Sequence, residues 1–200
     1  MVMSDRSTTP RRRLTRDDWV AAALAAVAEG GLATVAVEPL AARLGATKGS
    51  FYWHFPNRDA LLAAALAAWE ETTTTAVLAE VEGAPGGPVD QLRLLISRVV
   101  DLAERDPIGL ALLPHATHPV IGPALTRVTR HRIDGTVRIF ARLGFRPAEA
   151  RRRALLAYSA YLGHSQLAHS TPLVLPAGKA ARQAYLDHVL AALTTPPNPT

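Results

Sequence analysis

The apolar residues of this chain recur every three or four positions, and no stretch alternates apolar and polar side chains over a useful length. The first spacing places side chains on one face of an α-helix, whereas alternation is typical of a strand. Val and Ile are also too scattered to build a sheet. The sequence therefore predicts an all-α protein with about nine helices. The clearest apolar stripes are Trp19, Ala23, Ala26 and Val27, then Leu62, Leu66 and Trp69, and then Leu92, Leu95, Val99 and Leu102.

Capping residues, glycines and prolines predict where these helices begin and end. Thr15 with Asp17 and Asp18 has the pattern of a capping box, and Gly30 with Gly31 ends the first helix. Thr47 and Asn57 are the expected N-caps of the third and fourth helices, a task that suits their side-chain oxygens. Further helices are expected over about residues 37–44, 48–54, 58–82, 92–102, 108–113, 125–140, 148–169 and 179–193.

Composition limits the classes of protein to which this chain can belong. Hydrophobic residues make up 48% of its 200 residues and charged residues 20%, which fits a folded protein and excludes a disordered or collagen-like one. The absence of cysteine excludes thiol catalysis and cysteine-ligated metal sites, and it favours a reducing compartment. The net charge of +5 and the pI near 10.2 favour an acidic partner such as nucleic acid.

One segment, residues 40–55 with the sequence LAARLGATKGSFYWHF, carries most of the functional information. Two short helical stretches joined across Gly45 form a helix-turn-helix, whose second helix enters the major groove of DNA. That second stretch begins with hydroxyls, a lysine and a glycine, and it continues with aromatic hydrogen-bond donors that can reach phosphates. The segment therefore predicts binding of double-stranded DNA.

The region from Thr15 to Leu62 resembles the TetR family of bacterial transcriptional regulators. The resemblance implies an N-terminal three-helix DNA-binding domain and a C-terminal helical domain for ligand binding and dimerisation. It also implies a ligand-responsive regulator, expected to be a repressor that binds a palindromic operator as a dimer and is released by a small, largely apolar molecule. The residues that carry the resemblance are Glu29, Gly30, Gly31, Leu32, Leu40, Ala41, Leu44, Gly45, Phe51, Tyr52, Trp53, His54, Phe55, Asn57, Arg58, Leu61 and Leu62.

The resemblance assigns roles to individual residues of the helix-turn-helix. Four residues match the base-reading start of the recognition helix, three match its backbone-contacting cluster, and one matches a phosphate-contacting residue at the start of the fourth helix. Phe51 and Phe55 are expected in the core against Leu40 and Leu44. The predicted DNA-binding residues, in that order, are Thr47, Lys48, Gly49 and Ser50, then Tyr52, Trp53 and His54, and then Arg58.

One feature departs from the family pattern at the start of the second helix. The family has Ser or Thr as the N-cap there, whereas this chain has Ala36, Val37, Glu38 and Pro39. A capping bond worth about 1 kcal/mol is then missing, and Glu38 would repel a nearby phosphate. Thr34 would substitute in part if the helix began earlier. The departure puts the contacts of the second helix with DNA in question more than the fold.

The domain boundaries follow from the same pattern. Residues 1–14 are expected to form a disordered basic arm, residues 15–60 the DNA-binding domain, residues 61–195 the ligand-binding and dimerisation domain, and residues 196–200 a tail. The chain starts with no apolar targeting segment, and charged residues interrupt its apolar stretches before about 18 residues. We therefore expect a cytoplasmic protein with no membrane partner.

The helices after Leu62 combine large apolar side chains with many alanines that leave space and with a few polar groups. An apolar cleft with sparse polar groups is the usual site for a small molecule. The simpler reading, that each of these residues only fills the core, remains open at this point. The predicted effector-binding residues are Leu66, Trp69, Leu95, Val99, His115, His131, Phe140 and Tyr158.

The last two helices each carry two apolar stripes, although an outer helix of a monomer needs only one. We expect one stripe to face the core and the other a second copy of the chain, which gives a two-fold homodimer through a four-helix contact. In this reading Leu155, Leu162, Leu186, Leu190 and Leu193 form the other stripes. The predicted interface residues are Ala154, Tyr161, Ala181, Tyr185, His188 and Ala192.

Other chemistry finds little support in the sequence. His115 and His118 have the spacing of metal ligands, but Pro114 and Pro119 interrupt the helix that would align them, so neither a metal nor a cofactor is expected. The serines near His164 lack a nucleophile elbow, which disfavours catalysis. The alternative function is a helical small-molecule carrier or enzyme of the same architecture that does not bind DNA.

Overall fold

The computed structural model describes residues 13–195, which form helices and turns without a β-strand in that range. The predicted all-α fold is confirmed. The arm and the tail fall mostly on residues 1–12 and on residues 196–200, which lie outside the described part. The helices are α1 (Arg16–Gly30), α2 (Val37–Arg43), α3 (Lys48–His54), α4 (Arg58–Glu70), α5 (Ala76–Gly83), α6 (Pro88–Arg105), α7 (Ile108–Leu112), α8 (Ile121–Arg142), α9 (Pro147–Ser170) and α10 (Lys179–Thr194).

Three of the predicted helix caps are present. The Thr15 hydroxyl accepts a hydrogen bond from the Asp18 amide, and the Asp18 side chain accepts one from the Thr15 amide, so the capping box is complete. Thr47 accepts from the Ser50 amide at 3.2 Å, and Asn57 accepts from the Ala60 amide at 2.9 Å. These bonds satisfy amides that the first turn of each helix leaves free.

The start of α2 is uncapped, as its sequence predicts. Ala36 occupies the N-cap position and makes no side-chain capping bond. Thr34 does not substitute, because α2 begins at Val37 and the Thr34 hydroxyl donates instead to the carbonyls of Ala26 and Gly31. That hydroxyl therefore closes the end of α1, and the expectation that it supports α2 is wrong.

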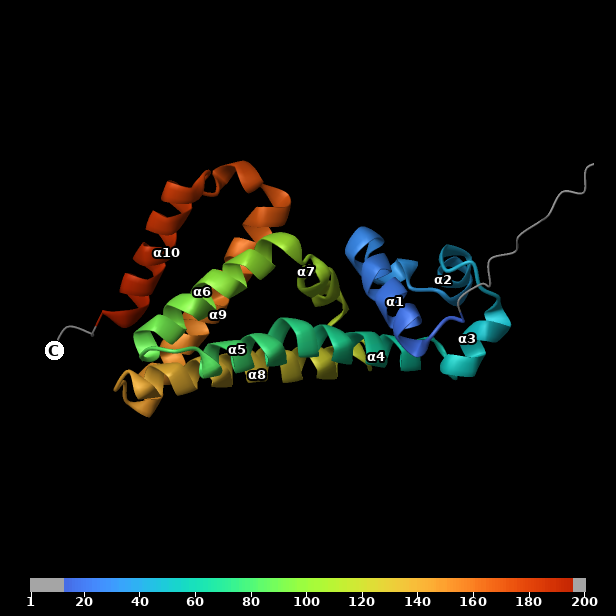
Figure 1. Cartoon of the computed structure of the whole chain (residues 1–200), viewed down its shortest axis with the longest axis horizontal. Helices are drawn as coiled ribbons and strands as arrows, with labels where there is room; N and C mark the ends of the chain where they lie inside the picture. The colour runs from blue at the N-terminus through green and yellow to red at the C-terminus, as the bar shows by residue number, and fades with distance from the viewer. Residues whose placement is uncertain (1–12, 196–200) are drawn as a thin grey trace, which may run out of the picture.

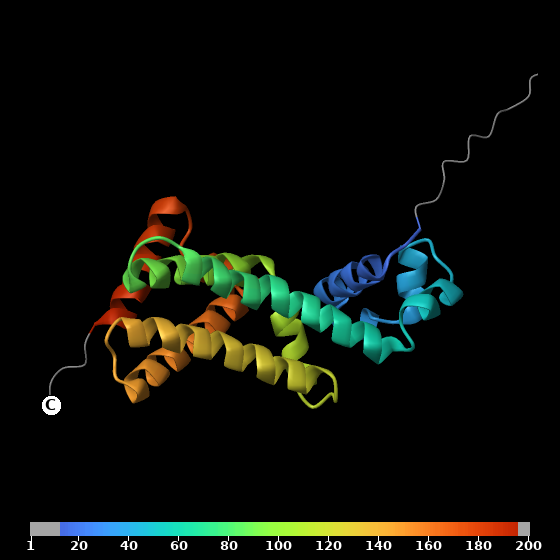
Figure 2. The same ribbon diagram turned by 60° about the horizontal axis from the view of Figure 1, so that its bottom comes forward.

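The predicted fourth helix is a rod that contains an irregular turn. Residues Glu71–Thr75 form a π turn between α4 and α5, so these two segments and the turn make one continuous helix. If α4, the π turn and α5 are counted as one helix, residues 13–195 contain nine α-helices. Figure 2 shows the rod of α4 and α5 running beside α8. A π turn inserts one extra residue into the helix and changes which side chains share a face, and such turns are frequent at functional sites.

Two hydrophobic cores hold the molecule together. The first lies under α1–α3 and continues through α4 to Leu112, Ile121 and Val128 of α7 and α8. The second lies among α5, α6, α8, α9 and α10. In Figure 1 the helix-turn-helix forms one end of the elongated molecule and α10 lies at the other. Because α4 packs in the first core and continues into α5 of the second, it connects the two halves rigidly.

Candidate functional sites

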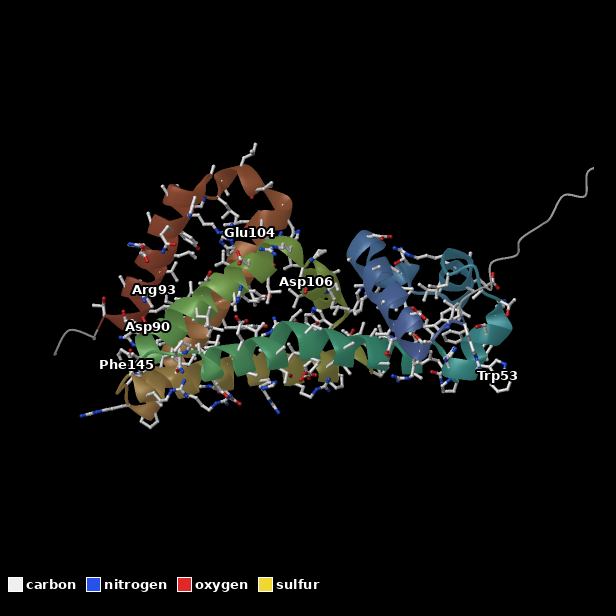
Figure 3. All side chains as sticks on the ribbon, viewed as in Figure 1. Trp53, Asp90, Arg93, Glu104, Asp106 and Phe145 are labelled. Atoms are coloured by element: carbon white, nitrogen blue, oxygen red, sulfur yellow. The ribbon has the colours of Figure 1, made fainter. Side chains whose placement is uncertain are left out.

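The recognition helix α3 divides cleanly into a buried and an exposed face. Phe51 and Phe55 are almost fully buried in the first core, as expected. Tyr52 is 58% exposed and Trp53 is 87% exposed, so packing in the core is not the role of Trp53. Figure 3 places Trp53 at the outer edge of the helix-turn-helix. Large aromatic side chains held out in solvent are typical of a surface that binds a partner.

The cationic and hydroxyl residues lie at the start of the same exposed face. Thr47, Lys48 and Gly49 are exposed, while Ser50 and His54 are partly covered. Lys48 forms an ion pair with Glu38 of α2. The hydrogen bond and the negative charge of Glu38 raise the pKa of Lys48, and Lys48 correspondingly lowers the pKa of Glu38. The lysine is therefore fully charged at neutral pH, and an acidic partner on the protein accompanies it.

Arg58 has a structural role that the resemblance did not suggest. Its Nε donates to the carbonyl of Val35, and one terminal nitrogen donates to the carbonyl of Leu32 at 3.0 Å. These bonds tie the start of α4 to the segment between α1 and α2 in the first core. We therefore leave Arg58 out of the proposed DNA contacts.

The second half of the molecule contains a cavity of about 80 Å³ between α6 and the helices α8, α9 and α10. Three of the predicted effector-binding residues, Leu95, Val99 and Tyr158, line it. Most of the remaining wall is aliphatic, from α5, α6 and the end of α10. The further apolar lining residues are Val77, Leu78, Leu92, Ile96, Val100, Leu102, Ala157, Ala160, Val189 and Leu193.

The other predicted effector-binding residues do not line this cavity. Leu66 is buried in the first core and Phe140 in the second, since both pack against neighbouring helices. His115 lies in a 3₁₀ turn after α7, and His131 is partly exposed with its Nδ1 4.0 Å from a carboxylate oxygen of Glu70. Their polar groups stay outside the cavity. Apolar spacing identifies buried faces, but it does not distinguish a packed core from a cavity wall.

Trp69 does not line the cavity but packs against Arg132 of its polar side. Its indole nitrogen donates to Asp106 at 2.8 Å, and its ring lies under the Arg132 guanidinium at 5.2 Å. A smaller hollow beside the main cavity is lined by Trp69 and Tyr158. Figure 3 places Asp106 where α6 meets α7. Trp69 therefore connects α4, the end of α6 and the side chains that face the cavity.

The predicted effector-binding residues did not include the main polar groups of the cavity wall. Arg132 of α8 donates to the hydroxyls of Thr74, Thr73 and Tyr161, at 2.8, 3.0 and 3.2 Å. The π turn supplies the two adjacent threonines, and the only sequence signal for it is the polar run at residues 71–75 within an otherwise apolar helix. Burial raises the pKa of Tyr161 although Arg132 opposes this, so its hydroxyl stays protonated.

The exposed surface of α9 and α10 differs in part from the predicted interface. Ala154 is fully buried in the second core, and Tyr161 and Tyr185 line the cavity, so these three residues face inward. Leu155 and Leu156, by contrast, are 54% and 58% exposed. On α9, therefore, Ala154 and Tyr161 face inward and Leu155 faces solvent, while Leu162 is partly covered. The predicted residues that remain on the surface are Ala181, His188 and Ala192.

Two searches of residues 13–195 gave negative results. No helix there is long and apolar enough to cross a membrane. No group of three or more His, Asp or Glu side chains in that range is arranged to hold a metal ion. His118 instead accepts a hydrogen bond from the Val120 amide at 3.2 Å, which is a local structural role.

A helix-turn-helix with an exposed recognition helix, joined to a helical domain with an internal cavity, defines a DNA-binding regulator of the one-component type. Residues 20–65 match the family model described as bacterial regulatory proteins, tetR family. Over these residues the chain matches the TetR family of bacterial regulators, and the predicted resemblance is confirmed. The family model and the similar solved structures support a transcriptional regulator.

Solved structures extend this likeness over nearly the whole chain. A transcriptional regulator from Rhodococcus sp. RHA1 is 25% identical, with a TM-score of 0.73 over 90% of this chain and 94% of that one. A TetR-family regulator from Agrobacterium tumefaciens is 17% identical, with a TM-score of 0.72 over 90% and 97%. FadR from Bacillus subtilis, solved in complex with stearoyl-CoA, is 14% identical, with a TM-score of 0.68 over 90% and 98%. The last two show the shared fold alone. A search of curated proteins by sequence found no match.

Proposed function

We propose that this protein is a repressor that binds a palindromic operator as a homodimer and is released from it by a small, largely apolar molecule. The observation that carries the proposal is the exposed face of α3, where Lys48, Tyr52 and Trp53 point away from the protein. Base edges would be read by Thr47, Lys48, Gly49 and Ser50, and phosphates would be contacted by Tyr52, Trp53 and His54. Residues 15–60 would act as the DNA-binding domain in the cytoplasm.

A dimer is required by the geometry of such recognition. One recognition helix reads only a short half-site, and a second copy must reach a half-site about 34 Å away on the same face of the duplex. Exposed residues on both helices support an interface there, namely Leu155 and Leu156 of α9 and Ala181, His188 and Ala192 of α10. Small alanines allow two copies of these helices to approach closely in an isologous contact.

The cavity supports a site for the effector. Its volume of about 80 Å³ is smaller than that of most ligand sites, so binding would push α6 away from α8 and α9. Bacillus subtilis FadR was solved with an acyl thioester bound, which supports an apolar effector for this fold. A ligand that fits only the expanded form would shift the population towards it.

The contacts of α4 supply the connection from the cavity to the DNA. Trp69 of α4 lies beside the cavity and hydrogen-bonds Asp106, while Arg58 at the other end of α4 holds the segment before α2. A displacement of α6 would therefore move α4, and α4 would move the two recognition helices out of register with the half-sites. Binding of the effector would then lower the affinity for the operator.

The proposal is tested by a screen followed by a release assay. Thermal-shift screening of the full chain with apolar and aromatic compounds should find compounds that stabilise it. Those compounds should also release the protein from DNA taken from upstream of its own gene. Compounds that stabilise the protein without changing its affinity for that DNA would overturn the proposed regulation.

A further inference from the structure

The cation in the wall of the cavity lacks a counter-ion. Among residues 13–195, Arg132 makes hydrogen bonds only to hydroxyl groups and ring contacts with Trp69 and Tyr161, and it forms no ion pair. Two other arginines of α8 have acidic partners, since Arg127 pairs with Glu70 and Arg138 with Glu82. A partly buried charge held without an opposite charge is costly, and proteins seldom keep one.

The hydroxyls around Arg132 orient the guanidinium without neutralising it. The Thr73 hydroxyl donates its own proton to the carbonyl of Trp69 at 2.7 Å, so its oxygen is left to accept from Arg132. Thr74 is 1% exposed and accepts from Nε. Of the five N–H groups of the guanidinium, three are used in this way, and two on the terminal nitrogens remain for a ligand.

A second polar atom in the same wall also lacks a partner. His164 of α9 lines the cavity and is 5% exposed, and its Nδ1 is buried without a hydrogen bond. Its Nε2 lies 3.3 Å from Glu104, which places the proton of the neutral ring on Nε2. His164 lies one helical turn from Tyr161, so the two side chains share a face of α9 next to Arg132.

The remaining wall, from α6, is aliphatic and includes Leu92, Leu95, Ile96 and Val99. The cavity thus has one polar side with a positive charge and one apolar side. A planar carboxylate matches two free N–H groups of a guanidinium better than any neutral group does. The Tyr161 hydroxyl, which accepts from Arg132, keeps its own proton to donate to a carboxylate oxygen.

We propose that the effector is a small carboxylic acid, bound with its carboxylate at Arg132 and its hydrocarbon part against α6. This inference rests on the proposed function and narrows the class of effector from any apolar molecule to an anionic one. Because the Arg132 guanidinium lies over Trp69 of α4, a carboxylate at Arg132 would bind a side chain that itself packs against α4.

Calorimetric titration of the full chain with paired ligands tests this inference. The probes are butanoate, hexanoate, octanoate and benzoate, each compared with its primary amide, which has nearly the same shape and no charge. For the best pair, the wild type should bind the acid at least about tenfold more tightly than the amide. Equal affinity for acid and amide, or no binding of any acid at about 1 mM, would overturn the proposal.

Variants of α8 assign the preference to one side chain. Arg132→Met should abolish the preference for the acid, whereas Arg130→Met should keep it. Arg130 lies on the exposed side of the same helix, so this control makes the same change in net charge. If Arg132→Met does not fold, Arg132→Gln removes the charge and keeps two donors. A preference that persists in an Arg132 variant would contradict the assignment.

The same ligands separate this inference from the proposed function. If a neutral compound binds and releases the DNA while acids show no advantage, the regulator remains as proposed and the class of effector is wrong. If acids bind through Arg132 but leave the affinity for DNA unchanged, the class of ligand stands and the proposed regulation fails.

Discussion

Lys48, the first residue of the recognition helix, forms an ion pair with Glu38 of the preceding helix. The Glu38 carboxylate is exposed on the same surface as the lysine. In the free protein the pair competes with DNA for the lysine, and in the complex the carboxylate repels the phosphate. We therefore expect Glu38 to weaken the binding of DNA.

The first prediction is that Glu38→Gln binds DNA more tightly than the wild type, by roughly three- to tenfold at low salt, with a smaller gain at high salt. Fluorescence anisotropy on labelled duplex measures both affinities. Glu29→Gln is the matched control, because Glu29 is also an exposed acid paired with an arginine, Arg43, at the end of α2. An equal gain in DNA affinity in both variants would show that net charge alone causes it, and would contradict a specific role of Glu38.

The second prediction concerns Arg58 and the stability of the DNA-binding domain. Arg58→Met should lower the free energy of unfolding by about 1–3 kcal/mol, because the Val35 carbonyl loses the Arg58 donor and the Leu32 carbonyl keeps only the Val35 amide. Denaturation in urea, followed by circular dichroism, measures the loss. If Arg58→Met is as stable as the wild type but binds DNA more weakly, Arg58 contacts a phosphate, as the resemblance implied.

The third prediction concerns the dimer. Leu156→Glu and Ala192→Glu should each convert the dimer into a monomer of about 21.4 kDa, because they place charges on the exposed surface of α9 and α10. Sedimentation equilibrium at micromolar concentration measures the mass. Val89→Glu is the control, since Val89 is also an exposed apolar residue but lies at the start of α6. A dimer that survives both interface changes would place the contact elsewhere.

The fourth prediction concerns the cluster that holds α10 against α6. Arg182 of α10 bonds to Glu104 at 2.6 Å and to Asp101 at 2.7 Å, and His164 of α9 also faces Glu104. Burial alone would raise the pKa of Glu104, but the hydrogen bonds from Arg182 and His164 outweigh it and lower this pKa below its ordinary 4.5. The cluster therefore stabilises the fold above pH 4.5, and this contribution is lost as the pH falls through the lower, folded pKa.

Arg182→Met should accordingly be less stable than the wild type at neutral pH, and the difference should shrink as the pH falls below 4.5. Urea denaturation at a series of pH values measures both proteins. Arg151→Met is a suitable control, because Arg151 forms an exposed ion pair with Asp134 away from this cluster. A difference that stays constant from neutral pH to strongly acidic pH would rule out the ionisation of Glu104 as its source.

The helices of this protein were predictable because their signals are local. Thr15, Thr47 and Asn57 cap helices whose apolar residues repeat at the helical spacing, and neither signal depends on distant parts of the chain. The burial of Phe51 and the exposure of the recognition face follow in the same way. The π turn at residues 71–75 was not predictable, because the hydroxyls of this turn bond to a distant residue. Arg132, which donates to Thr74, lies 58 residues later in the chain.

The cavity and the interface were predicted only in part, because both depend on which side of a helix meets which neighbour. Phe140 and Leu95 are both large apolar residues on predicted helices, yet Phe140 packs in the core and Leu95 lines the cavity. On α9, Ala154 is buried in the second core, whereas the next residue, Leu155, is exposed. Small residues at a close helix contact within one chain look the same as small residues at a dimer contact.

The central claim, that α3 recognises a DNA sequence, is tested most directly by fluorescence anisotropy of the full chain on duplex from upstream of its own gene. A shuffled duplex of equal length serves as competitor. The account predicts preferential binding of the upstream duplex, an affinity that falls steeply with salt, and a loss of affinity in folded Lys48→Ala and Tyr52→Ala proteins. Equal binding of both duplexes, or variants that bind as tightly as the wild type, would contradict it.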